Sequence, residues 1–277
     1  MKRILYSLFC FFIFGISYAQ QTPAPKQTSY YTIEGATAHL GNGKIIENSL
    51  LMFSNGKLNF VGSANMRIAR KGIVINAKGK HVYPGFIATN TSLGLAEIDA
   101  VRATRDFDEV GAMLPHIRSI IAYNTESKVV ETMRPNGILI AQIAPRGGTI
   151  SGTSSVVQLD AWNWEDAVLN LDAGVHINWP SSFSRGRWWL GEDSALKPNK
   201  KYAEEVKNIR DYFNNAKRYL QGSKTPKHLP FESLERVFQG SKKIFIHVGG
   251  KKAIVDAIDT FKKLNLNNLV IVHGEGA

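Results

Sequence analysis

The chain has 277 residues, of which 44% are hydrophobic and 21% are charged. This composition is typical of a globular protein of one or two domains and argues against a disordered chain or a coiled coil. The formal net charge is +11, but its Lys and Arg residues are spread out and carry no aromatic-basic motif, so we expect a solvated basic surface and no nucleic-acid partner.

The first residues have the three parts of an export signal. Lys2 and Arg3 provide the positive region, residues 4–16 the apolar region, and residues 17–19 (SYA) a small-x-small cleavage site. The apolar run is short for a membrane span, and a polar linker (residues 20–29) follows at once. We therefore expect residues 1–19 to be removed, and the mature protein to be periplasmic or secreted without a stable membrane anchor.

The cysteine content limits the disulfides and the cysteine-dependent catalysis that the protein could have. Cys10 is the only cysteine and lies inside the predicted signal. The mature chain would therefore have neither disulfides nor a thiolate nucleophile.

Short β-type runs broken by turn pairs characterise residues 30–84. The pairs are Asn42-Gly43, Asn55-Gly56 and Lys78-Gly79. Residues 50–54 and 57–62 flank Asn55-Gly56, a pair that accepts the positive φ angles of a two-residue hairpin turn. The pattern predicts a small β-sandwich domain.

A glycine-rich segment, residues 146–153 (RGGTISGT), separates two predicted strands at residues 137–144 and 155–160. It has neither the Lys-Ser/Thr ending of a phosphate-binding loop nor the spacing of a dinucleotide turn. We expect a tight strand-to-helix loop facing a pocket, with Arg146 near an anion. Asp160 ends the second strand, where it could bind a metal or cap the following helix.

The next stretch contains two further groups of candidate residues. His176 alternates with apolar neighbours on a predicted strand and is a candidate metal ligand. All five tryptophans fall between residues 162 and 189. Trp188, with Arg185 and Arg187, could wall a substrate pocket and bind a carboxylate, could bind carbohydrate, or could simply pack a large loop.

The C-terminal part reads as helices and strands in alternation. Residues 200–220 are amphipathic and residues 231–238 form a shorter apolar pattern, which suits two outer helices. Two apolar runs, 244–248 and 269–272, flank a further helical pattern, and each has a histidine at or beside its end: His247 and His273. Strands joined by a crossover helix run parallel, so both imidazoles would reach one edge, where they could share a metal ion or be ordinary core histidines.

Residues 76–87 (NAKGKHVYPGFI), together with this terminal unit, resemble the amidohydrolase superfamily, in particular its imidazolonepropionase-like branches. The resemblance implies an α/β fold: half of a β-sandwich at residues 30–84, then a partial (β/α)8 TIM-like barrel over residues 85–277. His247 and His273 would end the fifth and sixth barrel strands as metal ligands. The remaining strands, and the aspartate that serves as general base, would lie beyond Ala277.

The sequence departs from the family after the first barrel strand. Most members carry an Asp-x-His-x-His motif there, whereas this chain has Ala88, Asn90 and Ser92, which are poor ligands for a divalent ion. Relatives that lack the pair, such as the N-acetylglucosamine-6-phosphate deacetylases, hold one ion with the two later histidines and an acid. The resemblance therefore implies one divalent ion, with zinc as the expected metal.

These features predict an exported, metal-dependent amidohydrolase that cleaves C–N bonds other than typical peptide bonds through a metal-activated water. Its substrate would be a small amide or cyclic amide, and it could form a homo-oligomer. The alternative is a barrel without metal or catalysis that acts as a binding or partner subunit.

Overall fold

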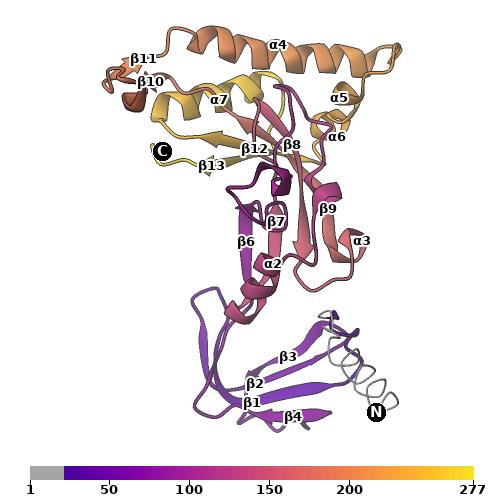
Figure 1. Ribbon diagram of the computed structural model, residues 1–277. Helices are drawn as coiled ribbons and strands as arrows, with labels where there is room; N and C mark the ends of the chain where they lie inside the picture. The colour runs from indigo at the N-terminus through magenta and orange to yellow at the C-terminus, as the bar shows by residue number, and fades with distance from the viewer. Residues whose placement is uncertain (1–21) are drawn as a thin grey trace, which may run out of the picture. The chain divides into compact units, whose positions relative to one another are not determined.

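The computed structural model describes residues 22–277, so the predicted signal at residues 1–19 lies outside the described residues. The chain divides into two compact units, Met1–Pro84 and Gly85–Ala277 (Figure 1). Across residues 22–277, no helix is long and apolar enough to cross a membrane.

One five-stranded sheet makes up the described part of the first unit. Its strands are β1 (Tyr31–His39), β2 (Ile45–Ser54), β3 (Lys57–Ser63), β4 (Ile73–Asn76) and β5 (His81–Val82). Their order is β3-β2-β1-β4, and β5 also pairs with β1. The predicted hairpin is present: Asn55 and Gly56, with φ angles of 50° and 69°, join β2 to β3. A second sheet layer, which the predicted sandwich would need, is not among residues 22–84.

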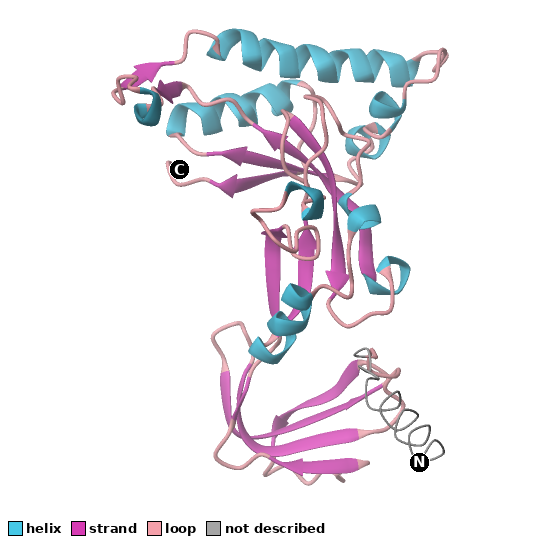
Figure 2. Ribbon diagram, in the orientation of Figure 1, coloured by secondary structure: helices cyan, strands magenta, loops and turns pink. Residues whose placement is uncertain are grey.

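A six-stranded sheet forms the centre of the second unit (Figure 2). Its strands are β6 (Phe86–Thr91), β7 (Ile138–Ile143), β8 (Ile150–Gln158), β9 (Val168–Asn178), β12 (Lys243–Val248) and β13 (Leu269–His273), in the order β13-β12-β9-β8-β7-β6. Five of these strands run in one direction, and β8 alone runs against its neighbours β7 and β9.

The reversal of β8 corrects one prediction. The glycine-rich segment is a strand-to-strand connection and the start of β8, and it does not lead into a helix. The reason is length: only residues 144–149 separate β7 from β8, and a parallel crossover needs a dozen residues or more. A (β/α)8 barrel has parallel strands throughout, so β8 is a departure from that architecture.

The second unit also contains 3-10 helices, α-helices and one small hairpin. The 3-10 helices are η1 (Arg102–Thr104), η2 (Ser119–Ala122), η3 (Arg134–Asn136) and η4 (Trp188–Leu190). The α-helices are α2 (Lys128–Met133), α3 (Trp164–Ala167), α4 (Tyr202–Gln221), α5 (Leu229–Glu232), α6 (Glu235–Phe238) and α7 (Lys251–Lys263), and the hairpin joins β10 (Phe183–Arg185) to β11 (Leu196–Pro198). The helix predicted at residues 231–238 is thus divided into two short ones.

Helices α4 and α7 cover one face of β9, β12 and β13 (Figure 1). On α4 the buried residues Tyr202, Ile209, Phe213 and Ala216 share one stripe, as the amphipathic pattern predicts. The ring of Phe213 lies 5.2 Å from that of Phe261 in α7. This apolar layer fixes the strands whose ends carry the histidines.

Two tyrosines of α4 give a matched test of this layer. The Tyr202 hydroxyl donates a hydrogen bond to Asp256 Oδ2 (2.8 Å) and accepts one from Trp179 Nε1 (3.3 Å), whereas the buried Tyr212 hydroxyl has no hydrogen-bond partner among residues 22–277. Tyr202→Phe should lower the free energy of unfolding by about 1–2 kcal/mol, and Tyr212→Phe should leave it unchanged or raise it slightly. Urea titration of both variants measures this difference, and equal costs would contradict it.

Candidate functional site

Three histidines lie at one edge of the second unit's sheet, on adjacent parallel strands. His176 is on β9, His247 on β12 and His273 on β13. His176 is opposite Phe245 in the register of β9 and β12. The alternate residues of β12, Ile244, Ile246 and Val248, belong to the helix-covered core. Strand alternation therefore puts His176 and His247 together on the other face of the sheet.

His273 reaches this face through its backbone conformation. It is opposite Val248 in the register of β12 and β13, so an extended backbone would direct it toward the helices. Its φ angle of 75° instead lies in the left-handed region, which is unusual for a residue with a side chain. As a result its ring centroid lies 5.7 Å from that of His247. Backbone strain of this kind is often found at functional sites.

His176 and His247 form a hydrogen-bonded pair. His176 Nδ1 and His247 Nε2 are 2.8 Å apart, with one nitrogen donating and the other accepting. The His176 ring is fully buried and stacks on Phe245, with centroids 4.8 Å apart. Its Nε2 is buried and has no hydrogen-bond partner in the part of the chain that the structure describes. The hydrogen bond holds His247 through its Nε2, and no residue among 22–277 forms a hydrogen bond with its Nδ1.

The environment keeps both rings neutral at neutral pH. Burial lowers the pKa of His176 to about 3, with help from repulsion by His247 and Arg146. Burial, followed by Arg146 and His273, lowers the pKa of His247 to about 4. Neutral imidazole is the form that binds a metal ion, so these rings need not release a proton to do so.

A guanidinium group is held beside the histidines. Arg146 donates hydrogen bonds from Nη1 to Asn90 Oδ1 (3.0 Å) and from Nη2 to the Asn90 carbonyl oxygen (2.6 Å). Burial lowers the pKa of Arg146, but an arginine side chain stays charged in proteins. Within residues 22–277, no Asp or Glu forms an ion pair with Arg146. Asn90, which stands where the sequence resemblance places a metal-binding histidine, thus anchors a cation.

Asp160 is not brought to this site. Because β8 is reversed, Asp160 follows the strand at the opposite edge of the sheet from His176 and His247. It forms an ion pair with Arg134. Nor does it cap the next helix: Asn163 caps α3, with its side chain accepting a hydrogen bond from the Asp166 backbone N–H.

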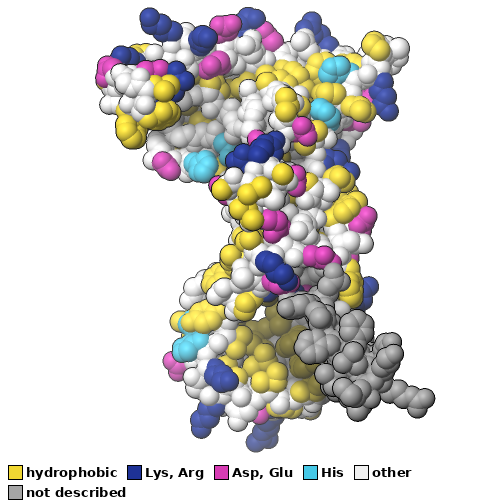
Figure 3. Space-filling model, in the orientation of Figure 1, with side chains coloured by type: hydrophobic (Ala, Val, Ile, Leu, Met, Phe, Trp, Pro, Cys, Tyr) yellow, Lys and Arg dark blue, Asp and Glu magenta, His cyan; other side chains and the backbone are white. Residues whose placement is uncertain are grey.

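The aromatic and arginine candidates lie on the arm formed by β10, β11 and η4. Arg187 is paired with Glu192, and the exposed Trp188 packs edge-on against Trp189. Hydrophobic side chains gather on this arm (Figure 3). In the described part of the chain, no hydrogen bond, ion pair or ring contact joins Arg185, Arg187 or Trp188 to the three histidines.

Sequence reasoning missed two residues of the site. Phe245, which stacks on His176, is two positions before His247 on the same strand, so strand periodicity could have identified it. Asn90 was recognised as a lost metal ligand, but its role as the anchor of Arg146 depends on a contact between distant parts of the chain.

The imidazole nitrogens of the site are the kind of donor that binds one zinc ion, but they do not suit a binuclear metal centre. An ion about 2 Å from one nitrogen of each of two rings places the ring centroids on the order of 5–6 Å apart, close to the value for His247 and His273. However, within residues 22–277 no group of three or more His, Cys, Asp or Glu side chains is arranged to hold a metal. His247 and His273 are the residues that would hold such an ion.

Comparison with solved structures identifies the fold. An amidohydrolase from Thermotoga maritima matches 88% of this chain and 64% of its own, with a TM-score of 0.72 and 21% sequence identity. The chain thus spans slightly less than two thirds of that protein's length. The predicted resemblance is confirmed for the fold alone: this chain and that amidohydrolase share a mixed α/β fold over 88% of this chain.

Other matches are too distant to support an argument. A prolidase complexed with N-methylphosphonate-L-proline covers 84% of this chain and 59% of its own, with 13% identity and a TM-score of 0.43. A D-hydantoinase covers 87% of this chain and 56% of its own, with 16% identity and a TM-score of 0.28. No protein-family model matches the chain. No curated protein matches it either.

Proposed function

We propose that this protein is a metal-dependent hydrolase of C–N bonds other than typical peptide bonds, with its centre at His176, His247 and His273. The observation that carries the proposal is the convergence of three imidazoles from three adjacent parallel strands, on an amidohydrolase-type fold. Ligand sites of such sheets lie at the C-terminal ends of the strands.

Each residue of the site has a distinct part in this proposal. His247, through the nitrogen that His176 leaves free, and His273 would hold one divalent ion, with zinc as the expected metal. When bound, that ion would activate a water molecule and polarise the scissile carbonyl. His176 fixes the orientation of His247 by their hydrogen bond, as partners of metal-binding histidines commonly do. Arg146 would bind a carboxylate or carbonyl oxygen of the substrate.

The proposal includes the other expectations from the sequence. The protein would be exported to the periplasm or secreted, would act on a small amide or cyclic amide, and would have no nucleic-acid partner or stable membrane anchor. A homo-oligomer is compatible with it.

Elemental analysis of the full-length protein tests the metal. We expect about one ion per chain in the wild type and none in the His247→Ala/His273→Ala double variant. The matched control is His39→Ala/His81→Ala, which removes another contacting histidine pair, in the first unit (3.0 Å between ring nitrogens), and should keep the ion. Loss of the ion in the control but not in the first double variant would contradict the assignment of His247 and His273.

One observation favours a second function, a metal-free binding subunit. The Arg146 guanidinium already provides positive charge beside the histidines, and no carboxylate in the described part of the site balances a further cation. A folded wild-type protein that contains no metal, and hydrolyses no amide or cyclic amide in a substrate screen, would favour this alternative over the hydrolase.

A further inference from the structure

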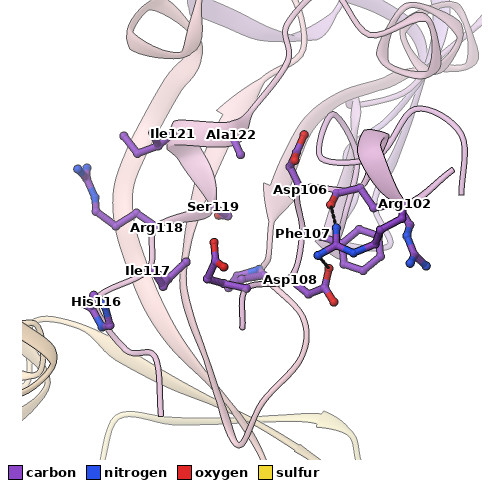
Figure 4. Close-up of a pocket in the computed structure, with 13 residues that line it drawn as sticks. Arg102, Asp106, Phe107, Asp108, His116, Ile117, Arg118, Ser119, Ile121 and Ala122 are labelled. Atoms are coloured by element: carbon purple, nitrogen blue, oxygen red, sulfur yellow. Dashed lines mark hydrogen bonds and ion pairs between the residues drawn. The ribbon is translucent and has the colours of Figure 1, made fainter. Parts of the chain in front are cut away.

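A pocket of about 490 Å³ lies in the second unit between two loop segments, residues 102–109 and 116–122 (Figure 4). Its volume is in the range of small-molecule sites. The backbone N–H of Arg146 donates a hydrogen bond to the Phe107 carbonyl oxygen (2.6 Å), which attaches the first segment to the end of β7. Pro145 lines the pocket, whereas the next side chain, Arg146, lies beside the histidines. Among the described residues that line the pocket, none is one of the three histidines.

Three residues that line this pocket each have a buried polar atom without a hydrogen-bond partner among the described residues. The atoms are Arg105 Nε, Asp108 Oδ1 and His116 Nδ1. Buried polar atoms in folded proteins are nearly always hydrogen-bonded, and each exception needs an explanation. These atoms have almost no exposed surface of their own, so a ligand in the pocket contacts the same side chains through their exposed parts; the Asp108 side chain is 38% exposed.

The charges around the pocket are opposite and incompletely paired. Among the described residues, no Asp or Glu forms an ion pair with Arg105, whose guanidinium lies 5.8 Å from the ring centroid of Phe107. Asp108 has only a loose ion pair, with its Oδ1 3.8 Å from Arg102 Nη2. Arg118, by contrast, forms a close ion pair with Asp172, with 2.9 Å between Arg118 Nε and Asp172 Oδ1. A ligand that complements this pocket carries both a negative and a positive group.

The remaining lining includes the carboxylates of Asp106 and Glu109 as well as an apolar surface. Phe107, Ile117, Ile121 and Ala122 provide this apolar surface. Figure 4 shows the two segments facing one another, with the apolar side chains of residues 117–122 across from Arg102 and Asp108. An apolar group on the ligand would be covered there.

We propose that this pocket binds a free α-amino acid with an apolar side chain, such as leucine. Its carboxylate pairs with Arg105, its ammonium group with Asp108, and its side chain contacts Phe107 and Ile121. Charge-assisted hydrogen bonds of this kind are the strong ones, and here they would be formed in a partly desolvated site. The proposal concerns a second site and stands whether or not the histidine site binds a metal.

Isothermal titration calorimetry on the full-length protein tests the proposal with three matched probes. They are L-leucine, 4-methylpentanoate, which lacks the ammonium group, and 3-methylbutylamine, which lacks the carboxylate. We expect leucine to bind and each singly charged analogue to bind at least about tenfold more weakly. Equal binding of the three probes, or no binding of leucine up to about 10 mM, would overturn the proposal.

Charge-neutral variants locate the site. Arg105→Gln and Asp108→Asn should each weaken leucine binding at least about tenfold, while Arg210→Gln, on the exposed side of α4, should leave it unchanged. Unweakened binding in both pocket variants would place leucine elsewhere and overturn the assignment. If either variant fails to fold by circular dichroism, the comparison of the three probes on the wild type still decides the question.

Discussion

Between about pH 7 and pH 4, the metal-free protein is expected to lose on the order of 3 kcal/mol of stability through His176. The pKa of this histidine is lowered from 6.5 to about 3 in the folded state, chiefly because the ring is fully buried. The unfolded chain therefore takes up a proton at pH values where the folded chain cannot. The stabilisation is present above pH 6.5 and is lost progressively as the pH falls toward 3.

His176→Phe separates this effect from general acid denaturation. Phenylalanine can keep the stacking on Phe245 but cannot be protonated, so the variant should show a flatter dependence of unfolding free energy on pH. His247→Phe, which removes the hydrogen bond but leaves a buried histidine, should keep most of the acid loss. Urea titrations at several pH values, with a chelator present, provide the measurement. Parallel curves for wild type and His176→Phe would show that His176 does not cause the loss.

Phe213→Ala is expected to lower the free energy of unfolding by about 3–5 kcal/mol. The side chain is fully buried in the helical layer, with its ring 5.2 Å from Phe261 and 6.3 Å from Phe238. Alanine leaves a cavity that these aromatic rings can fill only in part. Because the layer supports β12 and β13, loss of packing there should also reduce the metal binding that we propose for the histidines.

A surface position of α7 supplies the control for Phe213→Ala. Val255 is half exposed, so Val255→Ala should change the free energy of unfolding by less than about 0.5 kcal/mol. Thermal or urea unfolding of both variants gives the comparison. A cost below about 1 kcal/mol for Phe213→Ala would show that α4 is not packed on α7 as described.

Local sequence patterns determined several elements and one part of the site. The hairpin at Asn55-Gly56, helix α4, and the unit formed by β12, α7 and β13 follow from turn preferences and from the periods of strands and helices. The same unit brings His247 and His273 to one edge, because a crossover helix makes its two strands parallel. These features are predictable since each depends on residues that are near in sequence.

The tertiary structure alone decided the rest. Apolar runs predicted the strand at β8 but not its direction, and that reversal takes Asp160 away from the histidines. His176 meets His247 across 71 positions, and Arg146 meets Asn90 across 56. The positive φ angle of His273 turns its ring toward His247. The sequence does not predict this angle, because the residue is not a glycine. Periodicity shows which face of a strand a residue occupies, but strand order and direction determine which side chains meet, and both are set by packing of the whole chain.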